Sequence, residues 1–342
     1  MNFVATFLLG LVRRLKRGGV IINEHTLTRA DTCFHVEVLR RWFDFITLDE
    51  LPHRLTHRSR KPFCLLTFDD GKRSNFTEAA PELERLGVPA VFHVTTDPLT
   101  NGSCLWFDLH EQLVRALGYY PAGLKLNVLK RLPFDELMGR LERACAERQF
   151  KPSCASDDLR TMSWEEARSL HRRGFTIGAH GSSHAILTRE KRERAYAEIE
   201  ESLAKVSQEI GAPCTTFAFP DGSYSMELTQ HALRCGATTI MTTEPMWADQ
   251  NASLRRLPRI QLFGGSSRSR IELKIALAAF KGILTNPDGT GRRYCFGGRE
   301  EARLSPGMGV SQIGLLTNHR LAFFGAKTPT DEPSGRSQQR RR

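Results

Sequence analysis

Seven short runs of apolar residues, separated by segments of helical periodicity, constrain the fold of this chain more than any other feature. Alternation of this kind is typical of parallel strands joined by crossover helices. The runs are continuously apolar, which predicts strands that are buried on both faces. We place these strands at residues 20–24, 62–68, 88–95, 175–179, 215–219, 237–242 and 257–262.

At 342 residues the chain exceeds the usual size of one domain. Parallel barrels surrounded by helices, however, often reach about 250 residues as a single unit. We therefore expect one such domain at 20–285, with a helical insertion at about 100–160. An amphipathic, basic segment at 1–19 precedes it, and a basic, partly disordered tail at 286–342 follows it.

Helix ends are marked by capping residues. Ser163 and Glu166 form a capping box, and Gly174 closes that helix. A second helix is predicted at 188–210, with Thr188 as its cap, and a third begins at Ser225. Inside the insertion we expect two helices, at 108–117 and 135–149.

The net charge of +11 belongs mainly to the two ends of the chain. Residues 1–30 hold five basic and one acidic side chain, and residues 286–342 hold ten basic and five acidic ones. The segment between them therefore carries only +2, which argues against a specific nucleic-acid-binding surface on the folded body.

The N-terminal apolar run, from Phe3 to Val12, precedes its basic residues, whereas a secretory signal has the opposite order. It is also too short to span a bilayer. Four residues fall at helical spacing beside this basic end: Phe3, Phe7, Leu11 and Leu15. This pattern leaves two interpretations open, namely peripheral contact with a membrane or docking against the protein's own body.

The eight cysteines form no Cys-x-x-Cys pair, and Cys64 and Cys214 lie inside apolar runs. Unpaired thiols fit a reducing compartment. We therefore expect a cytoplasmic protein, with association to the inner face of the membrane as the variant that the N-terminal segment suggests.

Polar residues follow four of the predicted strands. Asp69 and Asp70 follow the second strand, His180 the fourth, Pro220 and Asp221 the fifth, and His25 the first. In a parallel barrel these strand ends converge on one rim, where catalytic groups gather.

Two adjacent carboxylates need a compensating cation, because like charges close together raise the pKa of one of them. His180 and His184, four residues apart, can present two imidazoles on one side of a turn. Two imidazoles and one carboxylate suit Zn²⁺ with an open position for water, and Co²⁺, Ni²⁺ and Mn²⁺ are alternatives. One Asp then binds the metal, and the other takes a proton from the activated water.

The motifs Thr67-Phe68-Asp69-Asp70-Gly71 and His180-Gly181-Ser182-Ser183-His184 resemble the first two motifs of the polysaccharide deacetylases, the NodB-homology carbohydrate esterases. The resemblance extends over residues 20–262. It implies a deformed seven-stranded (β/α) barrel, similar to a TIM barrel, that removes acetyl groups from N-acetylated sugars. It further implies that Asp69 is the catalytic base and that Asp70, His180 and His184 are the metal ligands.

Two motifs depart from the family pattern. Gly181 stands where many members have Ser or Thr, and Phe219-Pro220-Asp221-Gly222 replaces a motif whose Arg orients the base. We treat the Phe219–Gly222 motif as a variant of the family's third motif. Arg259 is a candidate replacement for the Arg that this motif lacks. By its position after the first strand, His25 resembles the catalytic acid of members with a permuted order.

Substrate binding is assigned to residues of this altered motif and to two residues beyond it. The backbone N–H of Asp221 is expected to hold the oxyanion, and Trp247 to form a wall on which a sugar stacks. The full set is Phe219, Pro220, Asp221, Trp247 and Arg259.

These observations predict a metal-dependent hydrolase acting on the C–N bond of an N-acetylated polysaccharide, oligosaccharide or glycan precursor. Two alternatives stay open. An O-acetyl esterase or another amidase would use the same water and metal, and a non-catalytic glycan-binding protein would have a weakened site. In each case the partner is a carbohydrate.

Overall fold

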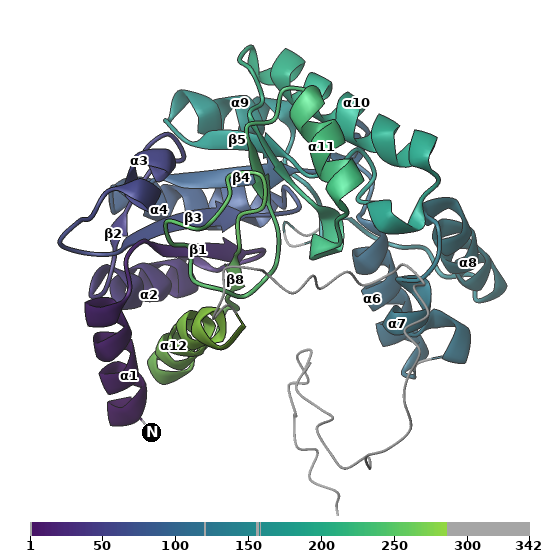
Figure 1. Ribbon diagram of the computed structural model, residues 1–342. Coiled ribbons are helices and arrows are strands. Elements are labelled where there is room, and N and C mark those ends of the chain that lie inside the picture. The colour runs from purple at the N-terminus through teal and green to yellow at the C-terminus, as the bar shows by residue number, and fades with distance from the viewer. Residues whose placement is uncertain (1, 120, 155–156, 158, 286–342) are drawn as a thin grey trace, which may run out of the picture. The chain divides into compact units, whose positions relative to one another are not determined.

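The computed structural model describes residues 2–119, 121–154, 157 and 159–285 (Figure 1). These residues belong to one structural unit. The tail predicted at 286–342 lies outside the described residues.

The core of the described chain is a parallel sheet that forms a deformed (β/α) barrel, as expected. Its strands are hydrogen-bonded in the order β7-β6-β5-β4-β3-β1-β8, and β2 pairs with β3. A parallel bridge between Met241 and Leu257 connects β7 to the segment that leads into β8. The strands are β1 Gly19–Glu24, β2 Asp44–Phe45, β3 Phe63–Phe68, β4 Ala90–Val94, β5 Thr176–Ala179, β6 Thr216–Ala218, β7 Thr239–Met241 and β8 Ile260–Gln261.

Six of the seven predicted runs contain one of these strands, and the run at 20–24 covers all of β1 except Gly19. β2 was not predicted, because a strand of only two residues is too short to show a hydrophobic pattern in the sequence. Side chains on both faces are buried: Ile21, Leu65 and Val91 belong to one apolar cluster, and Ile22 and Leu66 to the cluster beneath the helices. The prediction of strands buried on both faces is therefore confirmed.

Helices surround the sheet (Figure 1). The α-helices are α1 Asn2–Leu15, α2 Arg29–Arg40, α3 Leu51–Thr56, α4 Ala80–Arg85, α5 Thr96–Asn101, α6 Trp106–Leu117, α7 Leu126–Leu129, α8 Phe134–Glu147, α9 Trp164–Arg172, α10 Arg192–Ile210, α11 Met226–Arg234 and α12 Arg268–Thr285. A π-helical turn spans Asn75–Ala79, and 3₁₀ turns span Ala122–Leu124, Leu187–Arg189 and Pro220–Gly222.

The predicted helix ends agree with the structure except at one cap. Ser163 accepts from the backbone N–H of Glu166 in a complete capping box at the start of α9, and Ser225 caps α11. Thr188 does not cap α10, which begins at Arg192, because Leu187–Arg189 form a separate 3₁₀ turn.

The insertion contains α6, α7 and α8, which share an apolar cluster of their own. A disulfide between Cys104 and Cys154, fifty residues apart, joins its two ends. The expectation of unpaired thiols is wrong for this pair, because only the fold brings the two Cα atoms to 5.7 Å. Cys64 and Cys214, on which the expectation of a reducing compartment was based, are free thiols. The cytoplasmic location stays a prediction.

The N-terminal helix α1 packs against α12, and the two lie side by side in Figure 1. Among the described residues, no helix combines the length and the apolar character that crossing a bilayer requires.

Candidate active site

The carboxylate pair lies at the carboxyl end of β3. Asp69 continues the strand, and Asp70 turns away from it with φ of 75°, a backbone region that residues other than glycine seldom adopt. Gly71 follows with φ of 70°, and a Cβ there would lie 3.1 Å from Val94. This tight turn directs the two adjacent carboxylates to different partners.

Asp70 lies next to the two histidines that follow β5. Its Oδ1 is 3.5 Å from Nε2 of His180 and 3.2 Å from Nε2 of His184. All three side chains are buried, and their ligand atoms lie within 4.8 Å of one another. The residues that the sequence assigned to a metal are thus brought together by β3 and β5.

The orientation of the His180 ring follows from a backbone contact. Its Nδ1 lies 2.8 Å from the carbonyl oxygen of Ala218, which can only accept, so Nδ1 carries the proton. In the neutral ring, Nε2 then presents a lone pair toward Asp70. The Oδ1 of Asp70 is itself buried without a hydrogen-bond partner.

The turn between the two histidines is held by a buried glutamate that the sequence analysis missed. Glu198 on α10 accepts from the backbone N–H groups of Ser182 and Ser183, at 2.8 and 2.9 Å, and from the Ser183 hydroxyl at 2.5 Å. Gly181 has φ of 77°, and a Cβ there would lie 3.3 Å from Glu198. The glycine at this position therefore suits a turn built around the glutamate.

Asp69 forms a bidentate ion pair with Arg259. The guanidinium nitrogens lie 2.8 and 2.7 Å from the two carboxylate oxygens. Burial disfavours the charged form of Asp69, but Arg259 and His180 outweigh it and hold the pKa of this carboxyl well below its usual value. Arg259 is 0% exposed, so the direct substrate contact expected from the sequence is not available to it.

Three further buried residues complete the surroundings of Asp69. Asn23 and Thr67 each accept a hydrogen bond from Arg259 at 3.2 Å. His93 on β4 lies with Nδ1 3.2 Å from Asp69, and burial lowers the pKa of its ring to about 4. In the sequence His93 offered no signal beyond its place in an apolar run.

His25 lies at the carboxyl end of β1, on the same rim as the other site residues. Its Nδ1 is 3.3 Å from the amide nitrogen of Gln261 on β8. The ring is partly buried. Burial disfavours the charged form of Asp70, but the histidines around it outweigh this effect and hold the pKa of the carboxyl well below its usual value.

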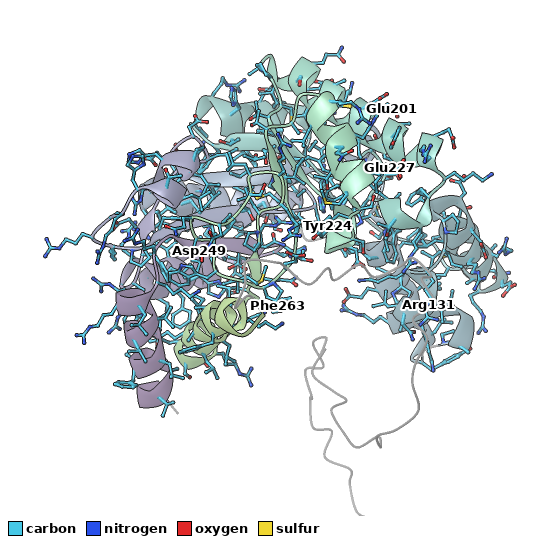
Figure 2. All side chains as sticks on the ribbon, viewed as in Figure 1. Arg131, Glu201, Tyr224, Glu227, Asp249 and Phe263 are labelled. Carbon is cyan, nitrogen blue, oxygen red and sulfur yellow. A yellow bond between two sulfur atoms is a disulfide. The ribbon has the colours of Figure 1, made fainter. Side chains whose placement is uncertain are left out.

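The altered third motif forms the 3₁₀ turn after β6. Asp221 adopts φ of 57° and pairs with Lys130 of the insertion. Pro220 is buried, and Phe219 is 0% exposed. The Phe219 ring lies 6.0 Å from that of Tyr224, and Figure 2 labels Tyr224. The Phe219 side chain is therefore part of the core, and Asp221 is the more accessible part of this motif.

Trp247 does not form the sugar-stacking wall that the sequence suggested. Its ring is 5% exposed and lies 5.8 Å from that of Phe43, and its indole N–H donates to the Arg17 carbonyl. The residue belongs to the core between the sheet and the N-terminal segment.

The insertion contributes residues that sequence reasoning missed. Trp106 on α6 donates from its indole nitrogen to the carbonyl oxygen of His184 at 3.2 Å, and the Phe107 ring meets His184 edge-on at 5.0 Å. Lys72, directly after the carboxylate motif, forms a buried ion pair with Asp108, whose pKa burial raises to about 6. Helix α6 is thus fixed both to the carboxylate motif and to the histidine motif.

Backbone strain is concentrated at this site. Four described residues other than glycine have positive φ, and Asp70, His184 and Asp221 are three of them. Such conformations cost free energy and persist where surrounding contacts enforce them, commonly at functional sites. The arrangement offers a cation-binding triad, an ionised carboxylate beside it and a strained backbone turn after β6.

Comparison with known proteins identifies a family. A model of the polysaccharide deacetylase family matches residues 56–240, more than half of the chain. A search among curated protein sequences found no match.

Several solved structures share the fold. The deacetylase PplD of Streptococcus pyogenes, in complex with acetate, is 15% identical with a TM-score of 0.53, covering 75% of this chain and 97% of that one. IcaB from Ammonifex degensii is 17% identical with a TM-score of 0.51, covering 77% and 99%. The BpsB deacetylase domain from Bordetella bronchiseptica is 15% identical with a TM-score of 0.50, covering 72% and 96%. At these identities the likeness shows the fold alone.

Proposed function

The chain belongs to the polysaccharide deacetylase family, and from this premise we propose that it is a metal-dependent hydrolase removing acetyl groups from an N-acetylated polysaccharide, oligosaccharide or glycan precursor. The observation that carries the proposal is the buried cluster of Asp70, His180 and His184 beside the ionised Asp69.

The residues of the cluster fit a divalent cation. A lone pair of His180 faces the Asp70 oxygen that lacks a hydrogen bond, so two hydrogen-bond acceptors lie side by side without a donor. Burying two acceptors in this way is unfavourable unless a positive charge lies near them. Two ligand bonds of about 2 Å at a tetrahedral angle separate their donor atoms by roughly 3.3 Å. The observed separations are 3.2 and 3.5 Å. Zn²⁺ suits this donor set best, with Co²⁺, Ni²⁺ and Mn²⁺ as alternatives.

A cation held there supplies Lewis acidity, which lowers the pKa of a water molecule toward neutrality. Asp69 is then the base that receives the proton of this water. Its pairing with Arg259 keeps it ionised and fixes its direction. The low pKa also makes it a weak base, so proton transfer depends on the acidity of the water.

The remaining roles fall to residues on the same rim. We assign His25 as the acid that protonates the leaving amine, in keeping with its place at the end of β1. The backbone N–H of Asp221 is assigned to the developing oxyanion, and the pairing of its side chain with Lys130 holds this turn. Arg259 acts through Asp69 as the orienting Arg that the third motif lacks.

The test is acetate release by purified protein loaded with metal. We expect release from an N-acetylated oligosaccharide, stoichiometric binding of one divalent ion, and loss of release with retention of metal in Asp69→Asn. Faster release from an O-acetylated sugar would establish the esterase alternative. If the wild type neither binds metal nor releases acetate, the enzyme proposal fails and the glycan-binding alternative is the one that remains.

A further inference from the structure

Helix α1 has apolar side chains on two different faces. On one face Ala5, Leu9 and Val12 are 3% exposed or less, in the interface with α12. On another face lies a row of four large apolar residues, which we call the α1 stripe. The stripe consists of Val4, Phe7, Leu11 and Leu15, which are 58%, 60%, 38% and 66% exposed.

The stripe is a single helical face. Its members follow one another at intervals of three or four residues, so they project from the same side of α1. Large apolar side chains scattered singly over a surface need no explanation, whereas a contiguous row marks an interaction site.

The helix cannot rotate to bury the stripe. Its inward face is already filled, and Thr6 donates to the buried Glu272 of α12 at 2.6 Å. Glu272 also accepts from the indole nitrogen of Trp42 at 3.0 Å. Just after the helix, the Lys16 ammonium lies 4.0 Å from the carboxylate of Asp249. The packing therefore fixes which face of α1 points outward.

The charge of this region selects the partner. Helix α1 contains no acidic residue, and it ends in Arg13 and Arg14, with Arg17 close behind. All three arginines are exposed. Arg14 follows Leu11 by three residues and lies beside the stripe, and all three arginines lie at the same end of α1. An apolar face with exposed arginines at one end matches the interface of an anionic bilayer, where the apolar side chains enter the headgroup region and the guanidinium groups meet phosphates. A second copy of α1 would offer these arginines no acidic partner.

We propose that α1 is an interfacial helix through which the protein binds the anionic surface of a lipid bilayer. The two readings that the sequence left open are then both true, on different faces: the helix docks on the body through one and meets the membrane through the other. Attachment would hold the catalytic domain beside substrates at the membrane surface. The inference is independent of the catalytic proposal, because binding is measured without substrate.

The experiment is co-sedimentation of the full chain with lipid vesicles. We expect binding to vesicles of phosphatidylcholine mixed with phosphatidylglycerol at least tenfold tighter than binding to phosphatidylcholine alone. F7D/L15D places two charges in the stripe without touching the buried face, and we expect it to weaken binding at least tenfold. Y119D/M226D is the matched control, since both residues are exposed apolar side chains outside α1, and it should bind like wild type.

Three results would overturn the proposal. The first is wild-type protein that stays in the supernatant with anionic vesicles. The second is equal sedimentation of F7D/L15D and wild type. The third is a dimer of the vesicle-free protein that F7D/L15D dissociates, which would assign the stripe to a second copy. Thermal unfolding of each variant, compared with wild type, confirms that the fold is retained.

Discussion

Replacing Arg259 by Met tests whether the base is held by the buried ion pair. The guanidinium is 0% exposed and makes two short hydrogen bonds to Asp69. Its removal leaves a buried carboxylate without its main positive partner. Breaking a buried pair in this way costs about 3–5 kcal/mol. We therefore expect R259M to lower the free energy of unfolding by that amount at pH 7.

The loss should depend on pH in a defined direction. In the wild type Asp69 has a lowered pKa, so its contribution to stability is full above the unfolded-state value of about 3.9 and declines as the pH falls toward the folded-state value. In R259M burial acts without its principal counterweight and raises the pKa of Asp69. Protonation of Asp69 then removes the uncompensated charge from R259M. The difference in free energy of unfolding between wild type and R259M should therefore shrink as the pH falls toward about 4.

The assay is urea unfolding in the presence of a chelator, so that metal binding does not add to stability. The set comprises wild type, R259M, D69N and R259M/D69N. Because D69N removes the uncompensated charge, we expect it to be neutral or stabilising in the R259M background while it destabilises the wild type. R168M is the matched control, since Arg168 pairs with Glu209 near the surface and should cost less than about 1 kcal/mol. Equal effects of D69N in both backgrounds would refute the coupling.

Three further outcomes follow from the contacts around the site. Glu198→Gln removes the charge that holds the turn between His180 and His184, the proposed metal ligands. We expect roughly 10–100-fold weaker Zn²⁺ affinity in a competition titration. Unchanged affinity would show that the turn is fixed by other contacts. Trp106→Phe loses one buried hydrogen bond to the His184 carbonyl, worth about 1 kcal/mol. We expect it to lower kcat severalfold at unchanged KM. A change in KM alone would show that α6 acts in substrate binding instead. Replacing both Cys104 and Cys154 by Ser should destabilise the insertion by about 2–4 kcal/mol. The loss should be measurable as faster proteolysis between α6 and α8. A variant that resists proteolysis as well as the wild type would contradict this expectation.

Much of the fold was predictable from local signals. A continuously apolar run of five or six residues has few alternatives to a strand buried on both faces, and capping residues such as Ser163 mark helix ends through hydrogen bonds to the next turn. β2 and the start of α10 were not predictable, because two residues show no period and a 3₁₀ turn competes with the cap at Thr188.

Part of the candidate site was predictable, because it consists of polar residues that rarely stand so close together in a sequence. Adjacent carboxylates after a strand, and two histidines four apart after another, are costly unless a cation compensates them. Arg259 was expected from the sequence to replace the Arg that orients the base, and it pairs with Asp69. The contacts of Glu198 and Trp106 were not predictable, since both residues reach the site from elements far away in the chain.

By itself, the sequence determined seven of the described strands, the helices marked by capping residues and apolar periodicity, and the residues able to bind a cation. These signals act between residues that are near neighbours in the chain. Tertiary structure alone decided two contacts that no motif indicated: Glu198 with the histidine turn, and Cys104 with Cys154. It also decided that Trp247 packs inward and that one face of α1 points outward. The physical reason is that burial and long-range pairing depend on which surfaces meet, and no local pattern of residues encodes that meeting.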